Sequence, residues 1–161
     1  MMQMYSSANT SINSAKLPII YKVGADMIRG RKCVDYGCGK YDNAIEYARD
    51  NLGSTVSPYD KYNRTETVNA VTLAGSYDVS ICSNVLNVIA EREIRHQVIA
   101  ECAKLAPVGL YTVYEGNGSG VGGVTKADCY QLNRKTVDYV GELAEVYGSV
   151  KRKGKLIVCK R

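Results

Sequence analysis

The sequence predicts a three-layer α/β domain in which helices cover both faces of a seven-stranded, mostly parallel sheet. Short apolar runs alternate with amphipathic segments along the 161-residue chain, which is typical of βαβ units. The last two apolar runs are separated only by a short basic turn containing Gly154, and so short a connection joins antiparallel strands. The chain has the length of one domain, so we expect this domain to end in an antiparallel C-terminal hairpin.

The predicted helices and strands follow one another in a regular order after residue 15. The segments with apolar residues at helical spacing are 16–28, 42–51, Glu91–Leu105 and Arg134–Leu143. Asp42 or Asn43 suits the N-cap of the second helix, Gly53 suits its end, and Pro107 closes the third. The predicted strands are Lys32–Tyr36, Thr55–Tyr59, Val68–Leu73, Tyr77–Ser83, Leu110–Tyr114, Ala144–Val150 and Lys155–Cys159.

The first fifteen residues differ in composition from the rest of the chain. Residues 1–15 are rich in Ser, Asn and Thr, which predicts a flexible arm, and residues 16–161 form the single predicted domain. The first fourteen residues contain no apolar core of a secretory signal, and no run of eighteen apolar residues occurs anywhere. We therefore expect a cytoplasmic protein without a membrane partner.

Neither the cysteines nor the single histidine has the spacing of a metal site. None of the six cysteines forms a Cys-x-x-Cys pair, and His96 is the only histidine. No metal is therefore expected. Several cysteines stand in apolar runs, where a thiol acts as a small hydrophobic group. His96 lies inside a predicted helix and is expected to be an ordinary helix residue rather than a base.

The glycine-rich turn at residues 35–39 is the candidate ligand site. It ends the first strand and leads into a helix, the place where ligands bind in parallel sheets. Asp35 suits the ammonium group of a ligand and opposes a pyrophosphate, and Asp42 stands where a dinucleotide site keeps a helix N-terminus free. Asp60, after the second strand, can accept hydrogen bonds from ribose hydroxyls. The alternative is a structural glycine turn with two solvated aspartates.

Three motifs together resemble class I S-adenosylmethionine-dependent methyltransferases. They are Asp-x-Gly-x-Gly at 35–39, Asp60, and the fourth-strand segment 77–86, and the resemblance covers about residues 16–160. It implies a Rossmann-like fold, S-adenosylmethionine as the cofactor and methyl transfer as the reaction. It also implies that Asp60 binds ribose and that Lys61 or Tyr62 packs near adenine. The cofactor-binding residues that it implies are Asp35, Tyr36, Gly37, Cys38, Gly39, Asp60, Lys61, Asn84 and Val85.

A narrower resemblance concerns methyltransferase-like proteins associated with DNA phosphorothioation clusters. It is carried by the 35–39 turn, the 59–62 turn, the segment 84–89 and Tyr130-Gln131, although this chain is much shorter than those proteins. Ser83–Leu86 stands where amino-directed DNA methyltransferases carry an acidic-Pro-Pro-aromatic motif, and a Pro-Cys nucleophile is absent too. Both absences weigh against those two DNA chemistries.

The acceptor side is less defined by the sequence. Tyr114 and Glu115 end the fifth strand and are expected to face the ligand, with a core Tyr and a solvated loop Glu as the alternative. The glycine-rich segment 116–123 has the composition of a flexible lid, or of a plain surface connection. No general base is identified, so the catalytic residues stay unassigned.

A basic turn favours a nucleic-acid acceptor. Lys151, Arg152 and Lys153 lie at the site edge if the sixth strand runs parallel to the sheet, and a net charge of +5 permits nucleic-acid binding. A solvated hairpin tip is the alternative. The other basic residues expected near that rim are Lys61, Arg64, Lys126 and Arg134.

Two other functions remain open at this point. One is a non-catalytic S-adenosylmethionine-binding module or a subunit that supports a protein partner, because the chain has almost no segment for substrate recognition. The other is a different reaction that consumes S-adenosylmethionine, such as cleavage. The sequence identifies neither the acceptor atom nor the oligomeric state.

Overall fold

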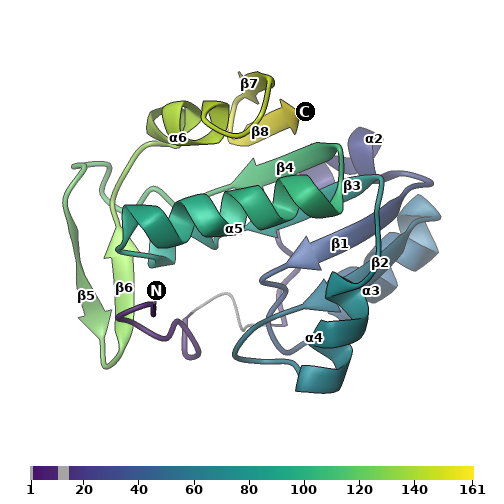
Figure 1. Cartoon of the computed structure of the whole chain (residues 1–161), viewed down its shortest axis with the longest axis horizontal. Helices are drawn as coiled ribbons and strands as arrows, with labels where there is room; N and C mark the ends of the chain where they lie inside the picture. The colour runs from purple at the N-terminus through teal and green to yellow at the C-terminus, as the bar shows by residue number, and fades with distance from the viewer. Residues whose placement is uncertain (1, 11–14) are drawn as a thin grey trace.

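The computed structural model describes residues 2–10 and 15–161, which form a six-stranded sheet and a separate two-stranded hairpin (Figure 1). The strands are β1 (Lys32–Tyr36), β2 (Thr55–Tyr59), β3 (Val79–Ser83), β4 (Val108–Thr112), β5 (Gly122–Lys126), β6 (Cys129–Leu132), β7 (Ser149–Lys153) and β8 (Leu156–Lys160). The α-helices are α1 (Ile20–Val23), α2 (Ala25–Ile28), α3 (Asn43–Tyr47), α4 (Glu66–Leu73), α5 (Arg92–Leu105) and α6 (Val140–Ala144). The remaining helical turns are η2 (Ala48–Leu52, π-helical), η3 (Leu86–Val88) and η4 (Thr136–Tyr139), the last two 3₁₀.

The main sheet has the strand order β2-β1-β3-β4-β8-β7. The first four of these strands are parallel to one another, and β8 runs antiparallel to both β4 and β7. The structure thus confirms the mostly parallel sheet and the antiparallel C-terminal hairpin. Because β1 pairs with β2 on one side and with β3 on the other, the strand order reverses between β1 and β3. Ligands of open α/β sheets bind at such a switch point.

The strand expected at Val68–Leu73 is wrong, because this segment is α4, so the main sheet has six strands rather than seven. The Thr65 hydroxyl caps the helix by accepting from the Val68 N–H at 3.2 Å. β2 is an edge strand of the sheet. Pro58 suits this position because proline has no N–H to offer a further strand. The Pro58 carbonyl instead accepts a hydrogen bond from the Thr72 hydroxyl of α4 at 2.7 Å. The β-branched residues of this segment therefore do not extend the sheet.

The β5–β6 hairpin was not predicted. Its first strand begins inside the glycine-rich segment 116–123, so only the earlier part of that segment is a loop. β5 is largely exposed, whereas β6 packs against η3 after β3. The hairpin extends past the carboxyl edge of the main sheet (Figure 1). It therefore adds a wall on the side of the switch point.

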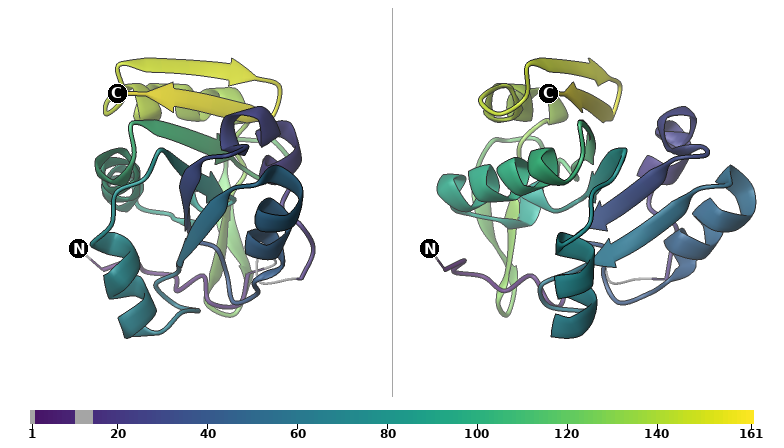
Figure 2. Two further views of the ribbon diagram at one scale, coloured as in Figure 1. Left: turned by 90° about the vertical axis from the view of Figure 1, so that its right-hand side faces the viewer. Right: turned by 45° about the vertical axis from the view of Figure 1, so that its right-hand side comes forward.

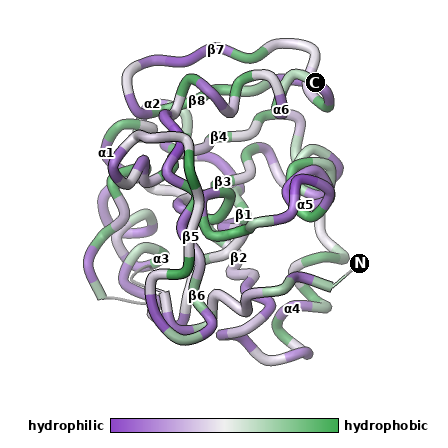
Figure 3. The backbone as a smooth tube through the Cα atoms, turned by 90° about the vertical axis from the view of Figure 1, so that its left-hand side faces the viewer, coloured by the Kyte–Doolittle hydropathy of each residue, from purple (hydrophilic) through white to green (hydrophobic). Residues whose placement is uncertain are grey.

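Two helical layers enclose the sheet, as Figure 2 shows. One core cluster joins Val34 and Tyr36 of β1 to α5 and α6, and the other joins Cys33 of the same strand to α1, α2 and α3. Alternate side chains of a strand point to opposite faces, so β1 contributes to both clusters. In Figure 3 helix α5 carries both hydrophilic and hydrophobic residues, as an amphipathic covering helix does.

Other boundaries also differ from the prediction. β3 begins at Val79 rather than Tyr77, and β4 spans Val108–Thr112 rather than Leu110–Tyr114. The helix expected over 16–28 is divided into α1 and α2 at Gly24, where a Cβ would lie 2.8 Å from the Ile20 carbonyl oxygen. The strand expected from Ala144 begins at Ser149, because Ala144 still belongs to α6. In residues 2–10 and 15–161, no helix combines the length and the hydrophobicity that crossing a bilayer requires.

Candidate functional site

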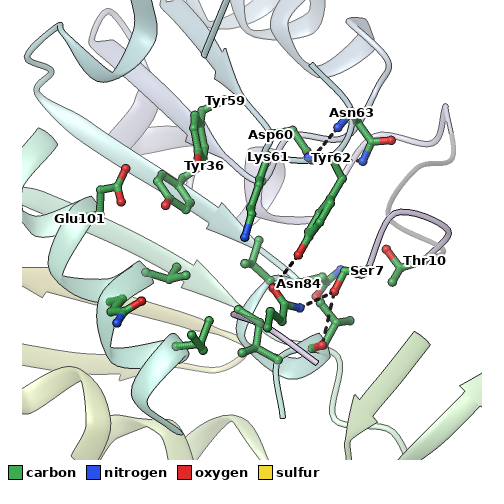
Figure 4. Close-up of a pocket in the computed structure, with 18 residues that line it drawn as sticks. Ser7, Thr10, Tyr36, Tyr59, Asp60, Lys61, Tyr62, Asn63, Asn84 and Glu101 are labelled. Atoms are coloured by element: carbon green, nitrogen blue, oxygen red, sulfur yellow. Dashed lines mark hydrogen bonds between the residues drawn. The ribbon is translucent and has the colours of Figure 1, made fainter. Parts of the chain in front are cut away.

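A cavity of about 280 Å³, here called the first cavity, opens at the carboxyl ends of β1, β2 and β3 (Figure 4). Tyr36 and Gly37 line it from β1, Tyr59 and Asp60 from β2, and Asn84 from the segment after β3. The tip of the first strand and the terminal acid of the second therefore share one cavity. The predicted ligand site also depended on the Asp35 carboxylate, which is buried and is not among the lining residues.

The glycine turn after β1 packs closely against the segment after β3. Gly37 has a φ of 86°, and a Cβ there would lie 2.4 Å from Val85 Cγ2, so only glycine fits. The N–H groups of Gly37 and Cys38 both donate to the Tyr59 carbonyl, at 2.7 and 3.1 Å. The Gly39 N–H donates to Asp60 Oδ2 at 2.8 Å. Protein acceptors thus occupy these three N–H groups, in agreement with a turn that does not cradle phosphate.

Arg64 holds the end of the glycine turn in place. Its Nε donates to the Gly39 carbonyl and its Nη2 to the Tyr41 carbonyl, both at 2.8 Å, while Nη1 pairs with Asp42 Oδ1 at 2.6 Å. Only 13% of the Arg64 side chain is exposed. Arg64 therefore acts as a structural clamp rather than as a cation on an open rim, and sequence reasoning missed this role because the partners are distant backbone carbonyls.

Asp60 lines the first cavity with a carboxylate that already organises the turn after β2. Oδ1 accepts from the Tyr62 N–H at 2.9 Å, the Asn63 N–H at 3.0 Å and Asn63 Nδ2 at 3.1 Å. Oδ2 accepts only from the Gly39 N–H. Since each carboxylate oxygen can accept about two hydrogen bonds, Oδ2 keeps capacity for one more donor.

Asp35 lies beneath the glycine turn and is buried. The Tyr21 hydroxyl donates to its Oδ2 at 2.5 Å, and its Oδ1 has no hydrogen-bond partner. Burial raises the pKa of Asp35 to about 6, although the hydrogen bond from Tyr21 opposes the increase. Asp35, Cys38 and Gly39 are not among the residues that line the first cavity. The predicted contact of Asp35 with a ligand ammonium group stays a prediction.

Aromatic side chains form one wall of the first cavity. Lys61 Nζ lies 5.4 Å from the centroid of the Tyr62 ring, and the rings of Tyr36 and Tyr59 are in contact, with their centroids 4.4 Å apart. Figure 4 shows Lys61 and Tyr62 extending side by side from the turn after β2. This wall offers flat apolar surface to a ligand ring.

The N-terminal segment lies across the mouth of the first cavity. The Tyr62 hydroxyl donates to Gln3 Oε1 at 3.1 Å, the Met4 N–H donates to Glu91 Oε1 at 2.8 Å, and the Ser7 hydroxyl donates to the Val88 carbonyl at 3.4 Å. Residues 11–14 of the predicted flexible arm lie outside the described residues. The part from 2 to 10 makes these contacts with the site.

Asn84 separates the first cavity from a second one. Its φ of 56° is in the left-handed region, which asparagine tolerates better than most residues, and such residues concentrate at functional sites. The second cavity measures about 380 Å³ and is lined by Asn84, Asn87, Tyr114, Lys126 and Gln131, among others. Sequence reasoning assigned no site role to Asn87 or Gln131. The signal available in the sequence for these two residues was an amide side chain within an otherwise apolar run.

The substrate-side candidates separate in the structure. Tyr114 is exposed and lines the second cavity, whereas Glu115 lines neither cavity. Glu115 pairs with Lys155 and accepts from the Thr136 N–H, and these contacts lower its pKa to about 2. Glu115 therefore connects the loop after β4 to η4 and to the β7–β8 turn.

The basic residues do not form a single rim. Lys151, Arg152 and Lys153 are exposed on β7, of which Lys153 reaches the carboxyl edge of the sheet, but the three side chains line neither cavity. Arg134 pairs with Glu142 and lies over the Tyr139 ring. Lys61 lines the first cavity and Lys126 the second. Within the described residues, no group of three or more His, Cys, Asp or Glu side chains could hold a metal ion.

No protein-family model and no curated protein matches the chain, but solved structures do. The 1,6-didemethyltoxoflavin-N1-methyltransferase of Burkholderia thailandensis, with 1,6-didemethyltoxoflavin and S-adenosylhomocysteine bound, matches with a TM-score of 0.62 and 12% identity, over 97% of this chain and 79% of that one. A sugar N-methyltransferase from Streptoalloteichus matches with a TM-score of 0.57 and 11% identity, over 95% of this chain and 97% of that one.

A third match is the magnesium protoporphyrin IX methyltransferase of Synechocystis with S-adenosylmethionine bound. Its TM-score is 0.55 and its identity 20%, over 89% of this chain and 76% of that one. At these identities the likeness concerns the fold. The chain has the Rossmann-like α/β fold of class I S-adenosylmethionine-dependent methyltransferases, with a mostly parallel sheet and an antiparallel C-terminal hairpin.

Proposed function

We propose that this protein binds S-adenosylmethionine in the first cavity and transfers its methyl group to an acceptor. The observation that carries the proposal is that the Gly37 turn, Asp60 and Asn84 line one cavity at the switch point between β1 and β3. Structures with this fold hold S-adenosylmethionine or S-adenosylhomocysteine, which supports the choice of cofactor. The comparisons do not support the narrower resemblance to phosphorothioation-associated proteins, and the proposal does not use it.

Four side chains fit the chemical groups of this cofactor. Asp60 Oδ2 has acceptor capacity for a ribose hydroxyl, and the Lys61–Tyr62 wall offers surface to the adenine ring. The Asp35 carboxylate has a buried Oδ1 without a partner, which an ammonium group would supply with a donor. We assign Asp60 to the ribose, Lys61 and Tyr62 to the adenine, and Asp35 to the methionine ammonium.

Bound cofactor would supply a methyl group on a sulfonium, an electrophile that needs an aligned acceptor more than an acid or base. Among the described residues that line the two cavities, the carboxylates are those of Asp60 and Glu101. Asp60 already accepts four hydrogen bonds. We therefore assign Asp60 to binding and orientation rather than to general-base catalysis, and leave the catalytic residues unassigned.

Titration calorimetry with S-adenosylhomocysteine tests the binding step. The wild-type protein should release or absorb measurable heat, and Asp60→Asn should bind at least tenfold more weakly, since one charged hydrogen bond is worth roughly 1.5–3 kcal/mol. Asp50→Asn is the matched control, because Asp50 is exposed and pairs only with Arg49. No heat from the wild-type protein at high micromolar concentration would overturn the proposal.

Mass spectrometry after incubation with S-adenosylmethionine and acceptor pools tests the transfer step. Methyl transfer yields S-adenosylhomocysteine together with a methylated product. Cofactor that binds without any product would instead favour a non-catalytic module or a subunit that supports a partner. Fragments of the cofactor without a methylated product would indicate cleavage.

We propose nucleic acid as the class of acceptor, and the basic residues of β7 as a surface, separate from both cavities, that binds its phosphates. Lys151, Arg152 and Lys153 are exposed along β7, which ends at the carboxyl edge of the sheet, the edge at which the first cavity opens. Phosphates of a nucleic acid bind such cationic side chains without base specificity. Charge reversal at these three positions, followed by salt-dependent binding measurements, tests this surface.

A further inference from the structure

We propose that the second cavity binds the methyl acceptor, and that this acceptor is a neutral or anionic nitrogen heterocycle that donates an N–H to Asn87 Oδ1. The inference rests on the proposed function, because it places the acceptor beside the assigned cofactor cavity. The two cavities share Thr10, Asn84 and Val88 as lining residues, so a ring in the second cavity would lie next to a ligand in the first.

A chain of hydrogen bonds determines which atom of Asn87 is available. Gln131 Nε2 donates to the carbonyls of Tyr114 and Leu132, at 2.9 and 3.0 Å, and this orients Gln131 Oε1 toward Asn87. Asn87 Nδ2 then donates to Gln131 Oε1 at 3.0 Å. The orientation of both amides follows from the two backbone acceptors, so Asn87 presents Oδ1 as its remaining group.

Within residues 2–10 and 15–161, two buried polar atoms around the second cavity lack a protein partner. Asn87 is 2% exposed, and its Oδ1 accepts no hydrogen bond. The Thr10 hydroxyl, which lines the same cavity, is also buried without a partner. Buried polar groups in proteins are almost always paired, so both atoms indicate a polar ligand. The amide oxygen requires a donor, and the hydroxyl can donate or accept.

The charges and rings of the lining select the class of ligand. No carboxylate is among the described lining residues, and Lys126 is the one charged side chain there, so an ammonium ligand would meet no counter-ion. The Tyr130 ring is already covered by Tyr5, which stacks on it with a centroid distance of 5.3 Å and an interplanar angle of 13°. Tyr114 also lines the cavity and is exposed, so its ring offers flat apolar surface to a ligand ring. A nitrogen heterocycle combines such a flat ring with an N–H donor and no positive charge.

Binding of defined probes, with and without saturating S-adenosylhomocysteine, tests the inference. The probes are the 5′-monophosphates of adenosine, guanosine, cytidine and uridine, measured by saturation-transfer NMR and calorimetry. We compare them with benzoate, which is flat and anionic but has no hydrogen-bond donor, and with spermidine, which is cationic. At least one nucleotide should bind at least tenfold more tightly than both comparison compounds. Equal binding of benzoate, or no nucleotide binding at millimolar concentration, would overturn the inference.

Variants then locate the bound probe. Asn87→Leu should weaken the best nucleotide at least tenfold, while Asn51→Leu, an exposed asparagine substitution remote from the cavity, should not change its affinity. Lys126→Ala should weaken the nucleotide but not the corresponding free base, with Lys104→Ala as the control. Nucleotide affinity that is unaffected by both Asn87→Leu and Lys126→Ala places the probe elsewhere and contradicts the inference. If Asn87→Leu does not fold, the Lys126→Ala variant tests the inference, because Lys126 is exposed and its substitution should not disturb folding.

The affinity for S-adenosylhomocysteine separates this inference from the proposed function. Wild-type protein that binds S-adenosylhomocysteine but no nucleotide refutes the inference and leaves the proposed function standing. Protein that binds neither compound contradicts both. Asn87→Leu should retain wild-type affinity for S-adenosylhomocysteine, because Asn87 does not line the first cavity.

Discussion

The two cavities at the carboxyl edge of the sheet differ in how completely the polar groups around them are hydrogen-bonded within the protein. Around the first cavity, the turn N–H groups, the Asp60 carboxylate and the Arg64 guanidinium all have protein partners. Around the second, Asn87 Oδ1 has none among the described residues, nor has the hydroxyl of Thr10, which lines both cavities. The first cavity, which we propose for the cofactor, is therefore largely preorganised by the chain itself. The second, which we propose for the acceptor, keeps hydrogen-bonding capacity for a ligand. Asp35, with its unpartnered Oδ1 beneath the glycine turn, is the exception on the first side.

The largest effect should come from Gly37→Ala, which tests whether the first cavity is rigid. The added Cβ would meet Val85 Cγ2, and alanine disfavours a φ of 86°. We expect a decrease of about 2–4 kcal/mol in unfolding free energy in urea denaturation and no detectable binding of S-adenosylhomocysteine. Adding Val85→Ala should recover part of the stability by removing the clash. A variant as stable as the wild type would show that the turn can move.

Asp35→Asn tests the role of the buried Asp35 carboxylate beneath the first cavity. Burial raises the pKa of Asp35 from 3.8 to about 6, so the folded protein binds this proton more tightly than the unfolded chain does. The ionised carboxylate therefore lowers stability above pH 6, and this loss disappears as the pH falls from about 6 to below 4. At pH 8 Asp35→Asn should raise the unfolding free energy by about 2–3 kcal/mol, because one pKa unit corresponds to about 1.4 kcal/mol. At pH 4 or below, the variant and the wild type should be nearly equal.

The same variant should have a lower affinity for the cofactor product. If Asp35 binds the ammonium group, wild-type affinity for S-adenosylhomocysteine should fall about tenfold per pH unit below pH 6, as the carboxylate becomes protonated. Asp35→Asn should bind more weakly and without this dependence. Calorimetry between pH 4.5 and 8 measures both. A wild-type affinity that does not change across this range would remove Asp35 from the binding site.

Arg64→Met tests the clamp on the glycine turn, with a smaller effect expected. The substitution removes donors to the Gly39 and Tyr41 carbonyls and the pair with Asp42. We expect a decrease of about 1–3 kcal/mol in unfolding free energy and roughly tenfold weaker S-adenosylhomocysteine binding. Arg49→Met is the matched control, since Arg49 is exposed and pairs only with its neighbour Asp50. Equal behaviour of the two variants would show that Arg64 has no special role.

The smallest effect concerns the basic residues of β7. Reversing Lys151, Arg152 and Lys153 to Glu should leave stability and S-adenosylhomocysteine affinity unchanged, because these side chains are exposed and line neither cavity. If they bind phosphates, the salt dependence of RNA or DNA binding should become shallower, with a slope reduced by about 0.7–0.9 for each phosphate that the variant no longer neutralises. Fluorescence anisotropy at several salt concentrations measures this slope. An unchanged slope would exclude this surface as a phosphate-binding site.

The sequence was informative wherever a local pattern decides the structure. The strands Lys32–Tyr36 and Thr55–Tyr59 have the predicted bounds, α5 begins one residue after its predicted start, and Gly53 ends the second predicted helix with a φ of 60°. Pro58 could also have identified β2 as an edge strand, because proline offers no N–H to a further neighbour. The β-branched residues of Val68–Leu73 led to the wrong prediction of a strand. The segment is helical, and the Thr65 hydroxyl caps its N-terminus.

Local sequence patterns were sufficient to predict the four parallel strands, the helix α5, the hairpin at the end of the chain, and the position of the glycine turn and Asp60 at strand ends. These features depend on apolar periodicity, proline and glycine, which act over a few residues. The folded arrangement alone revealed that Arg64 clamps the turn, that Glu115 pairs with Lys155, and that Asn87 and Gln131 meet across 44 residues of chain. Hydrogen bonds between segments so distant leave no periodic trace in the sequence, because each residue type is common and only the fold brings the partners within reach.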